Sequence, residues 1–439
     1  MAHDRKSQLM IDRRGFLKYA GVSALTAGLA GCASDDAGSN GGDANGGDKS
    51  GNGGTAGTTN GSMDSSSVNE VILGSNHPLS GALASTGTAM HHAVELAARN
   101  KNDAGGIQSL GGAKVKVAKG NNKGKQELGG QVTQELIQEG AQVVLGCYSS
   151  PVTTAATQVA ERQQTPFVIT VAADDDILQG RGLDYVYRPQ PPAQRMASDY
   201  ATLVPKVIRQ NGGTVETAGL FYVNNSYGQS ITDHLHENLP KQNIEIVAET
   251  AISVGASSAN TQVSKLKNAD PDTIIATTYV PGGVTLVKAL QNQNYRPPYL
   301  TACACATYTD ENAIADIGSF ANGIMDNNYA LNPTIEKTAR VKKQFRERYG
   351  QRMSASSGMA YVAGEVAIAG IEKAGTTDKQ AINTALQNIK YEDHIAAMGP
   401  IQFKENGENK NALAPVNQVR NLNVKVVYPE QFAEVPPKV

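Results

Sequence analysis

The sequence has little of what marks a nucleic-acid binder, a membrane channel or an enzyme. Its 39 Lys and Arg residues nearly balance its 41 Asp and Glu residues, so no overall charge attracts nucleic acid or another polyanion. Beyond residue 32, no stretch is apolar enough to cross a membrane. The segment GNNKGKQ at 120–126 lacks the glycine spacing and the Ser or Thr of a phosphate-binding loop, and no Gly-x-Ser-x-Gly turn occurs. We therefore predict a protein that is not an enzyme and that binds no cofactor.

Cysteine is also scarce, with four residues in the chain, namely Cys32, Cys147, Cys303 and Cys305. The last three are an odd number for an oxidising compartment. One disulfide with a leftover thiol and three buried thiols are both compatible with this count. Cys303 and Cys305 have no nearby His or Cys partner, so we predict no metal site there.

Three histidines near the start of the chain, His77, His91 and His92, are the other potential metal ligands. The adjacent pair points to different faces of a helix, and no third ligand lies at a useful spacing. We predict no metal site here, and we expect all three side chains to lie at the surface.

The N-terminal segment 11–32, IDRRGFLKYAGVSALTAGLAGC, has the order of an export signal. Arg13 and Arg14 begin a twin-arginine pattern, and the apolar run at 20–30 is too short to span a bilayer. The ending LAGC is typical of a lipobox, in which Cys32 is lipidated and becomes the mature N-terminus. The alternative is an ordinary secretory signal. We predict a protein anchored by lipid at the outer face of the cytoplasmic membrane.

Residues 33–67 contain mainly Gly, Ser, Asn and Asp, with almost no apolar surface to bury. This composition predicts a disordered tether between the lipidated cysteine and the folded part of the chain. As a random coil, the tether would hold the folded part about 30 Å from the membrane on average.

From residue 68 onward, apolar strands alternate with helical segments, which predicts an α/β fold with parallel sheets covered on both faces. The proline cluster at 189–192 separates two such series and marks a second domain. The strands expected are 71–74, 114–118, 143–145, 166–170, 217–223, 245–249 and 273–277, and the helices expected are 89–100, 128–138, 153–162, 228–238 and 260–268.

The loops that follow these strands are rich in hydroxyls and small residues, as in HPLSGALASTG, GCYSSPVTT, TVAADDD, VNNSYGQS, TTYVPGG and TACACATYT. Ligands bind at the carboxyl ends of strands in such sheets. Hydroxyl groups together with the N–H groups at helix starts can hold a carboxylate without a metal.

The pieces PLSGALASTG at 78–87, YSS at 148–150, AAD at 172–174 and NNSYGQS at 224–230 resemble the Leu/Ile/Val-binding family of ABC-importer solute-binding proteins. AGEVAIAGIEKAG, GPIQFKENG at 399–407 and VVYPEQFA at 426–433 match the closing segments of that family. The resemblance covers the chain from residue 68 to its end. It implies the type I periplasmic-binding fold, in which two lobes close by a hinge on a small ligand and the closed form is recognised by a membrane permease.

The resemblance also places domains and site residues. Lobe 1 would comprise 68–190 and 322–398, and lobe 2 would comprise 191–321 and 399–439, in a protein that acts as a monomer. The ligand's carboxylate and amino groups would be held by the serine loop and by the segment after the next strand, and two tyrosines would cover the ligand. The ligand-binding residues expected are Ser149, Ser150, Ala172, Ala173, Asp174, Tyr227, Tyr279, Thr86 and Cys303.

Two departures from the family leave the ligand open. Asp174 stands where an amino-acid binder usually has Ser or Thr, and the usual acidic partner of the ligand ammonium aligns near Cys303. Either Asp174 has taken over the ammonium of a branched-chain amino acid, or the ligand is an amide, a urea-like compound or a polyol. Ser149 and Ser150 also stand where they would cap the helix that follows. A sensor subunit that presents its ligand to a membrane receptor is the alternative to a transport component.

Overall fold

The computed structural model describes residues 68–438, which form two sheets, each covered by helices. The export signal, including Arg13, Arg14 and Cys32, and the tether at 33–67 lie outside the described residues. The first sheet has the order β2-β1-β3-β4-β5, and all of its strands are parallel. Its strands are β1 (Glu70–His77), β2 (Lys114–Asn121), β3 (Val143–Gly146), β4 (Phe167–Ile169) and β5 (Val186–Tyr187).

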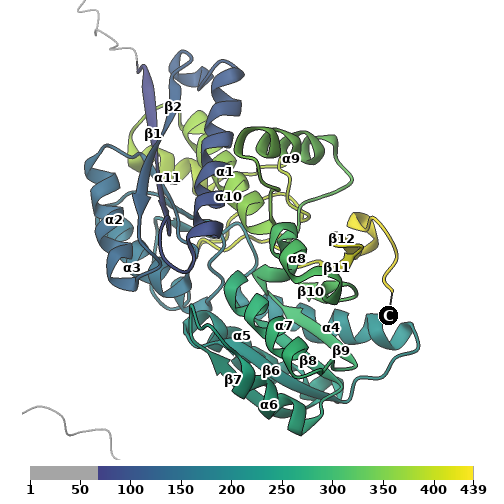
Figure 1. The fold of residues 1–439 in the computed structure, drawn as a ribbon. Coiled ribbons are helices and arrows are strands. Elements are labelled where there is room, and N and C mark those ends of the chain that lie inside the picture. The colour runs from purple at the N-terminus through teal and green to yellow at the C-terminus, as the bar shows by residue number, and fades with distance from the viewer. Residues whose placement is uncertain (1–67, 439) are drawn as a thin grey trace, which may run out of the picture. The chain divides into compact units, whose positions relative to one another are not determined.

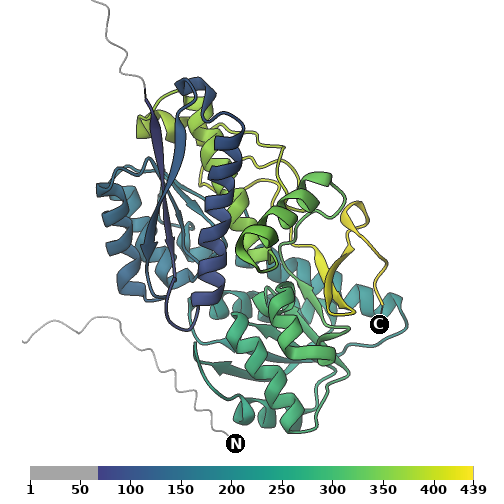
Figure 2. The same ribbon diagram turned by 45° about the horizontal axis from the view of Figure 1, so that its top comes forward.

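Helices cover both faces of this sheet, and we call the assembly lobe 1. One face packs against α1 (Ala84–Asp103) and α10 (Ala355–Ala374), which lie side by side although about 250 residues separate them (Figure 1, Figure 2). The other face carries α2 (Gln126–Gln138) and α3 (Ser150–Arg162). Strand β3 is apolar throughout because both of its faces are buried. Val143 and Leu145 enter one core, and Val144 enters the other.

The second sheet and its helices form lobe 2, with the strand order β12-β11-β10-β9-β8-β6-β7. Its strands are β6 (Thr217–Val223), β7 (Glu245–Ile252), β8 (Thr273–Thr277), β9 (Tyr299–Cys303), β10 (Met325–Asn327), β11 (Val416–Arg420) and β12 (Asn423–Tyr428). The sheet is mixed, because β11 pairs antiparallel with both β10 and β12. Its helices are α4 (Ala193–Gln210), α5 (Ser226–Asn238), α6 (Asn260–Ala269), α7 (Val280–Asn292) and α8 (Glu311–Ile317).

The chain passes between the lobes three times, and two of these crossings differ from the boundaries expected from sequence. Strand β10 pairs with β9 in lobe 2, so the second crossing falls after Asn327 and not before residue 322. The chain then forms α9 (Glu336–Tyr349), α10 and α11 (Lys379–Gln387). The third crossing follows residue 409 and not 398, because Glu408 bridges to Arg188 beside β5.

The three cysteines of the described residues are buried, and so are two of the three histidines near the start of the chain. Cys147, Cys303 and Cys305 are all free and buried, which is the three-thiol alternative. The prediction of surface histidines was wrong for His77 and His91, which are buried and both contact the Ser75 hydroxyl through Nδ1 at 2.9 Å. Burial, with a smaller contribution from His91, lowers the pKa of His77 to about 3, so its ring is neutral.

Within residues 68–438, no helix is both long and apolar enough to cross a membrane. The same part of the chain contains no group of three or more His, Cys, Asp or Glu side chains placed to hold a metal ion.

Candidate functional site

Loops of both lobes meet around one site at the carboxyl ends of their strands. The loops after β3 and β4 supply one wall, and the segments after β6, β8 and β9 supply the other. The cavity between the two walls is only about 10 Å³, which is room for no more than about one water molecule. The walls are therefore nearly in contact, and a ligand needs them to separate before it can enter. The lining residues are Tyr148, Ser150, Val171, Ala172, Ala173, Met196, Tyr227, Tyr279, Ala304, Ala306 and Tyr329.

Four buried tyrosines give the site its aromatic character. The ring centroid of Tyr279 lies 5.0 Å from that of Tyr148 and 5.4 Å from that of Tyr227. Tyr227 donates its hydroxyl to the Ala304 carbonyl, and the Tyr329 side chain lies beside Ser356. Burial raises the pKa of all four phenols above the ordinary value, so they stay neutral hydrogen-bond donors at physiological pH.

The hydroxyl of Tyr148 is the unpaired group of the site. It is buried and has no hydrogen-bond partner among the described residues, although the Thr86 side chain lies beside it. An unpaired buried hydroxyl is costly, because it has lost water and gained no partner. Its position in the lining makes it a donor available to a ligand.

Three helices begin at the site and direct their N-terminal N–H groups toward it. Ser150 is the first residue of α3, Tyr227 is the second residue of α5, and Tyr279 is the N-cap of α7. Each of these helices has 13 residues, and its N-terminus carries partial positive charge. This arrangement favours a ligand that carries negative charge or strong acceptor oxygens.

No lining residue carries a charge, and the two nearby carboxylates are engaged elsewhere. The Asp174 side chain accepts a hydrogen bond of 3.2 Å from the Asp176 backbone and lies beside the Ser226 side chain, and burial raises its pKa. Asp326 accepts from the backbone of Cys305 at 3.3 Å, behind the wall formed by Ala304 and Ala306, and burial raises its pKa to about 7. Neither carboxylate lines the site.

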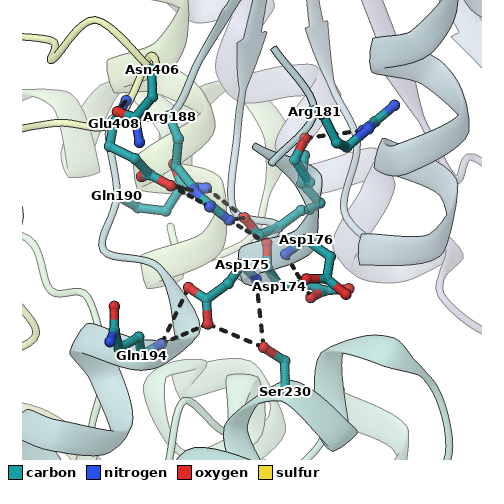
Figure 3. Close-up of polar contacts among 12 residues, drawn as sticks. Asp174, Asp175, Asp176, Arg181, Arg188, Gln190, Gln194, Ser230, Asn406 and Glu408 are labelled. Atoms are coloured by element: carbon teal, nitrogen blue, oxygen red, sulfur yellow. Dashed lines mark hydrogen bonds and ion pairs between the residues drawn. The ribbon is translucent and has the colours of Figure 1, made fainter. Parts of the chain in front are cut away.

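A buried ion pair holds the wall formed by Ala172 and Ala173 (Figure 3). The Arg188 guanidinium donates to the carbonyls of Ala172 at 3.2 Å and Asp174 at 2.7 Å, and its Nε lies 3.1 Å from a Glu408 carboxylate oxygen. Gln190 donates a further bond of 3.1 Å to the Ala172 carbonyl. Arg188 is fully buried, so this network fixes the backbone that lines the site.

The structure brings some of the expected residues into the lining and leaves others one layer behind. Ser150, Ala172, Ala173, Tyr227 and Tyr279 line the site, whereas Thr86, Ser149, Asp174 and Cys303 do not. Ser149 stands at the N-cap of α3, but its hydroxyl caps no backbone N–H and instead accepts from Tyr279 at 3.2 Å. Cys303 is buried in the core at the end of β9, and its neighbour Ala304 takes the place in the wall.

Six lining residues were not among those predicted from the sequence. Tyr148, Val171, Ala304 and Ala306 belong to loops whose position after strands already indicated the site. Met196 lies in α4, and Tyr329 follows β10, a strand that the sequence did not predict, so nothing in the local pattern marks either residue.

Comparison with known proteins relates this geometry to a family. Residues 70–421 match the family described as periplasmic binding protein. The chain is 26% identical over 373 residues to a Leu/Ile/Val-binding protein homolog from Brucella melitensis, an alignment that covers 83% of this chain and 92% of the relative. The family match confirms the predicted resemblance.

Two solved structures show the same fold. The branched-chain amino acid transporter substrate-binding protein LivJ from Streptococcus pneumoniae, in complex with isoleucine, superposes with a TM-score of 0.69 at 21% identity, covering 82% of this chain and all of that one. A solute-binding protein of an ABC transporter from R. palustris, in complex with benzoate, superposes with a TM-score of 0.71 at 17% identity, covering 82% and 95%. The family and both of these structures are described as binding proteins, which is the class of protein that the sequence predicts.

Proposed function

The chain belongs to the periplasmic binding protein family, and on that premise we propose that it is the extracytoplasmic solute-binding component of an ABC importer. It acts as a monomer that captures a small carboxylate-bearing solute between its two lobes, which close by a hinge and present the closed form to a membrane permease. The observation that carries this proposal is a site built from loops of both lobes, with walls nearly in contact.

A carboxylate suits the polar groups of this site. The N-terminus of α3 at Ser150 and the unpaired hydroxyl of Tyr148 supply donors in a buried setting, where hydrogen bonds to a charged acceptor are strong. The tyrosine rings and small apolar side chains around them suit an aliphatic or aromatic remainder.

Two ligand classes fit these features, and they differ in the need for an ammonium partner. A branched-chain amino acid brings an ammonium group that must be paired in a buried site, so Asp174 would have to leave its contacts with Ser226 and Asp176. A carboxylate without an ammonium group, such as an aromatic acid, needs no such change. The uncharged lining favours the second class.

A thermal-shift screen of residues 68–439 tests the proposal, after partial unfolding and dialysis to remove bound ligand. The panel contains leucine, isoleucine and valine, benzoate-type acids, and amides and ureas. We expect carboxylates to stabilise the protein, by about 2.7 kcal/mol in the free energy of unfolding at 100 times the dissociation constant. Hits confined to amides and ureas would contradict the carboxylate proposal, and a panel without hits would count against it.

We also propose that the protein is exported by the twin-arginine route and anchored through lipid on Cys32, as LAGC at 29–32 indicates. Cys32→Ser should move the protein from the membrane fraction to the extracytoplasmic soluble fraction, because the lipid would then be missing. Membrane fractions probed with an antibody measure this shift, with Cys147→Ser as the control. Unchanged membrane association of Cys32→Ser would argue for another anchor.

A further inference from the structure

A second set of contacts joins the lobes outside the ligand site. Asp175 begins a short 3-10 helix in lobe 1, directly after the segment that lines the site. Its carboxylate lies 2.7 Å from Nε2 of His234 and 3.3 Å from the Ser230 hydroxyl, both on α5 of lobe 2. It also accepts a bond of 3.1 Å from the backbone N–H of Gln194, at the start of α4 (Figure 3). These contacts form only when the two lobes are close together.

We propose that the pair of Asp175 and His234 is an interlobe latch, which sets how far the lobes close and therefore sets ligand affinity without touching the ligand. Asp175 lies two residues from Ala173, which lines the ligand site, so the latch also fixes the position of this segment. Arg188 fixes the same segment by donating to the Asp174 carbonyl. The link to affinity rests on the proposed capture function, whereas the link to closure does not.

The charges around His234 make the latch depend on protonation. His234 faces Asp175 from lobe 1 and Glu237 on its own helix, where Nδ1 lies 3.2 Å from the Glu237 carboxylate. The cleft beside Asp175 is also lined by four cations, namely Arg195, Lys241, Lys404 and Lys410, and by Glu408. Arg195 is already paired with Asp199 at 2.8 Å, and Glu408 is paired with Arg188. A protonated His234 therefore faces two carboxylates, and its side chain is only 19% exposed, which limits screening by solvent.

The sign of the pH effect follows from these partners. Burial alone would disfavour the charged ring, but the hydrogen bonds to Glu237 and Asp175 outweigh burial and raise the pKa of His234 above its ordinary value of 6.5. Opening the lobes removes Asp175 and lowers this pKa. Latch stabilisation is thus fully present below the open-state pKa, and it is lost as the pH rises through the higher closed-state pKa.

A tryptophan reporter can follow closure in the ligand-free protein, because the chain contains no tryptophan of its own. Gln179→Trp places the reporter on an exposed lobe 1 position that lines the cleft beside the latch. We expect its emission to change as the pH rises above 6.5, because the closed-state pKa of His234 lies above that ordinary value. His234→Gln and Asp175→Asn in this background should each abolish that change.

The matched control is His236→Gln, because His236 lies on the same helix and contacts Glu249 at the same distance of 2.7 Å, but within lobe 2. This variant should keep the transition. A transition that persists in both His234→Gln and Asp175→Asn, or one that His236→Gln also abolishes, would overturn the latch. So would a flat profile in the otherwise unaltered reporter protein.

The reporter titration needs no ligand, so its outcome is independent of the thermal-shift screen. If the screen finds a ligand, His234→Gln should weaken its binding about threefold to tenfold at pH 6 and much less at pH 8.5. An equal loss at both pH values would indicate a merely structural role and would contradict the latch.

Discussion

Arg188→Met should lower the free energy of unfolding by about 3–5 kcal/mol, because it leaves the Glu408 carboxylate without its partner in a buried setting. The carbonyls of Ala172 and Asp174 would also lose their donors. Gly407 shows how closely this region packs: a Cβ there would lie 1.9 Å from the Val186 carbonyl oxygen. Urea unfolding followed by circular dichroism measures the loss.

The control for this prediction is Lys425→Met, which breaks the pair with Glu434 at 2.6 Å near the surface. Such a pair contributes only about 0–1 kcal/mol. Arg188→Met with Glu408→Leu should recover part of the stability, since no charge is then left buried and unpaired. If Arg188→Met cost no more than Lys425→Met, the buried pair would not support the wall of the site.

Tyr148→Phe should move stability and binding in opposite directions. In the ligand-free protein, the change removes a buried hydroxyl without a partner and should raise the free energy of unfolding by about 1 kcal/mol. For the carboxylate found in the screen, the same change should weaken binding about 10- to 100-fold, because a hydrogen bond to a charged group is lost. Urea unfolding and isothermal titration calorimetry measure the two effects.

Tyr200→Phe is the matched control, because the buried Tyr200 hydroxyl contacts the Thr301 hydroxyl at 2.7 Å and does not line the site. It should lower stability by about 1 kcal/mol and leave the affinity unchanged. If Tyr148→Phe lowered the stability instead, the result would indicate that the Tyr148 hydroxyl is hydrogen-bonded to Thr86, which lies beside it. If Tyr148→Phe bound the carboxylate with unchanged affinity, Tyr148 would not take part in ligand recognition.

The local pattern of apolar and polar residues in the sequence predicted the strands and helices that position the site. The strands expected at 217–223 and 273–277 are β6 and β8 with the same bounds, because runs of apolar and β-branched residues end there at polar loops. Helix starts were predicted less well: α1 begins at Ala84, five residues before the expected start. Its N-cap, Leu83, makes no side-chain cap bond, so no capping residue signalled the start.

The sequence by itself determined the alternation of strands and helices, the family, and the loops after strands in which most of the site lies, because short-range patterning encodes all of these. Only the tertiary structure decided which loop residues face the ligand. It turned Asp174 and Cys303 away, added Tyr329 and Met196, and paired Arg188 with Glu408 across 220 residues. It also joined Asp175 to His234 across the lobes. Such contacts depend on how the lobes pack and where the chain crosses between them, and no local spacing records that geometry.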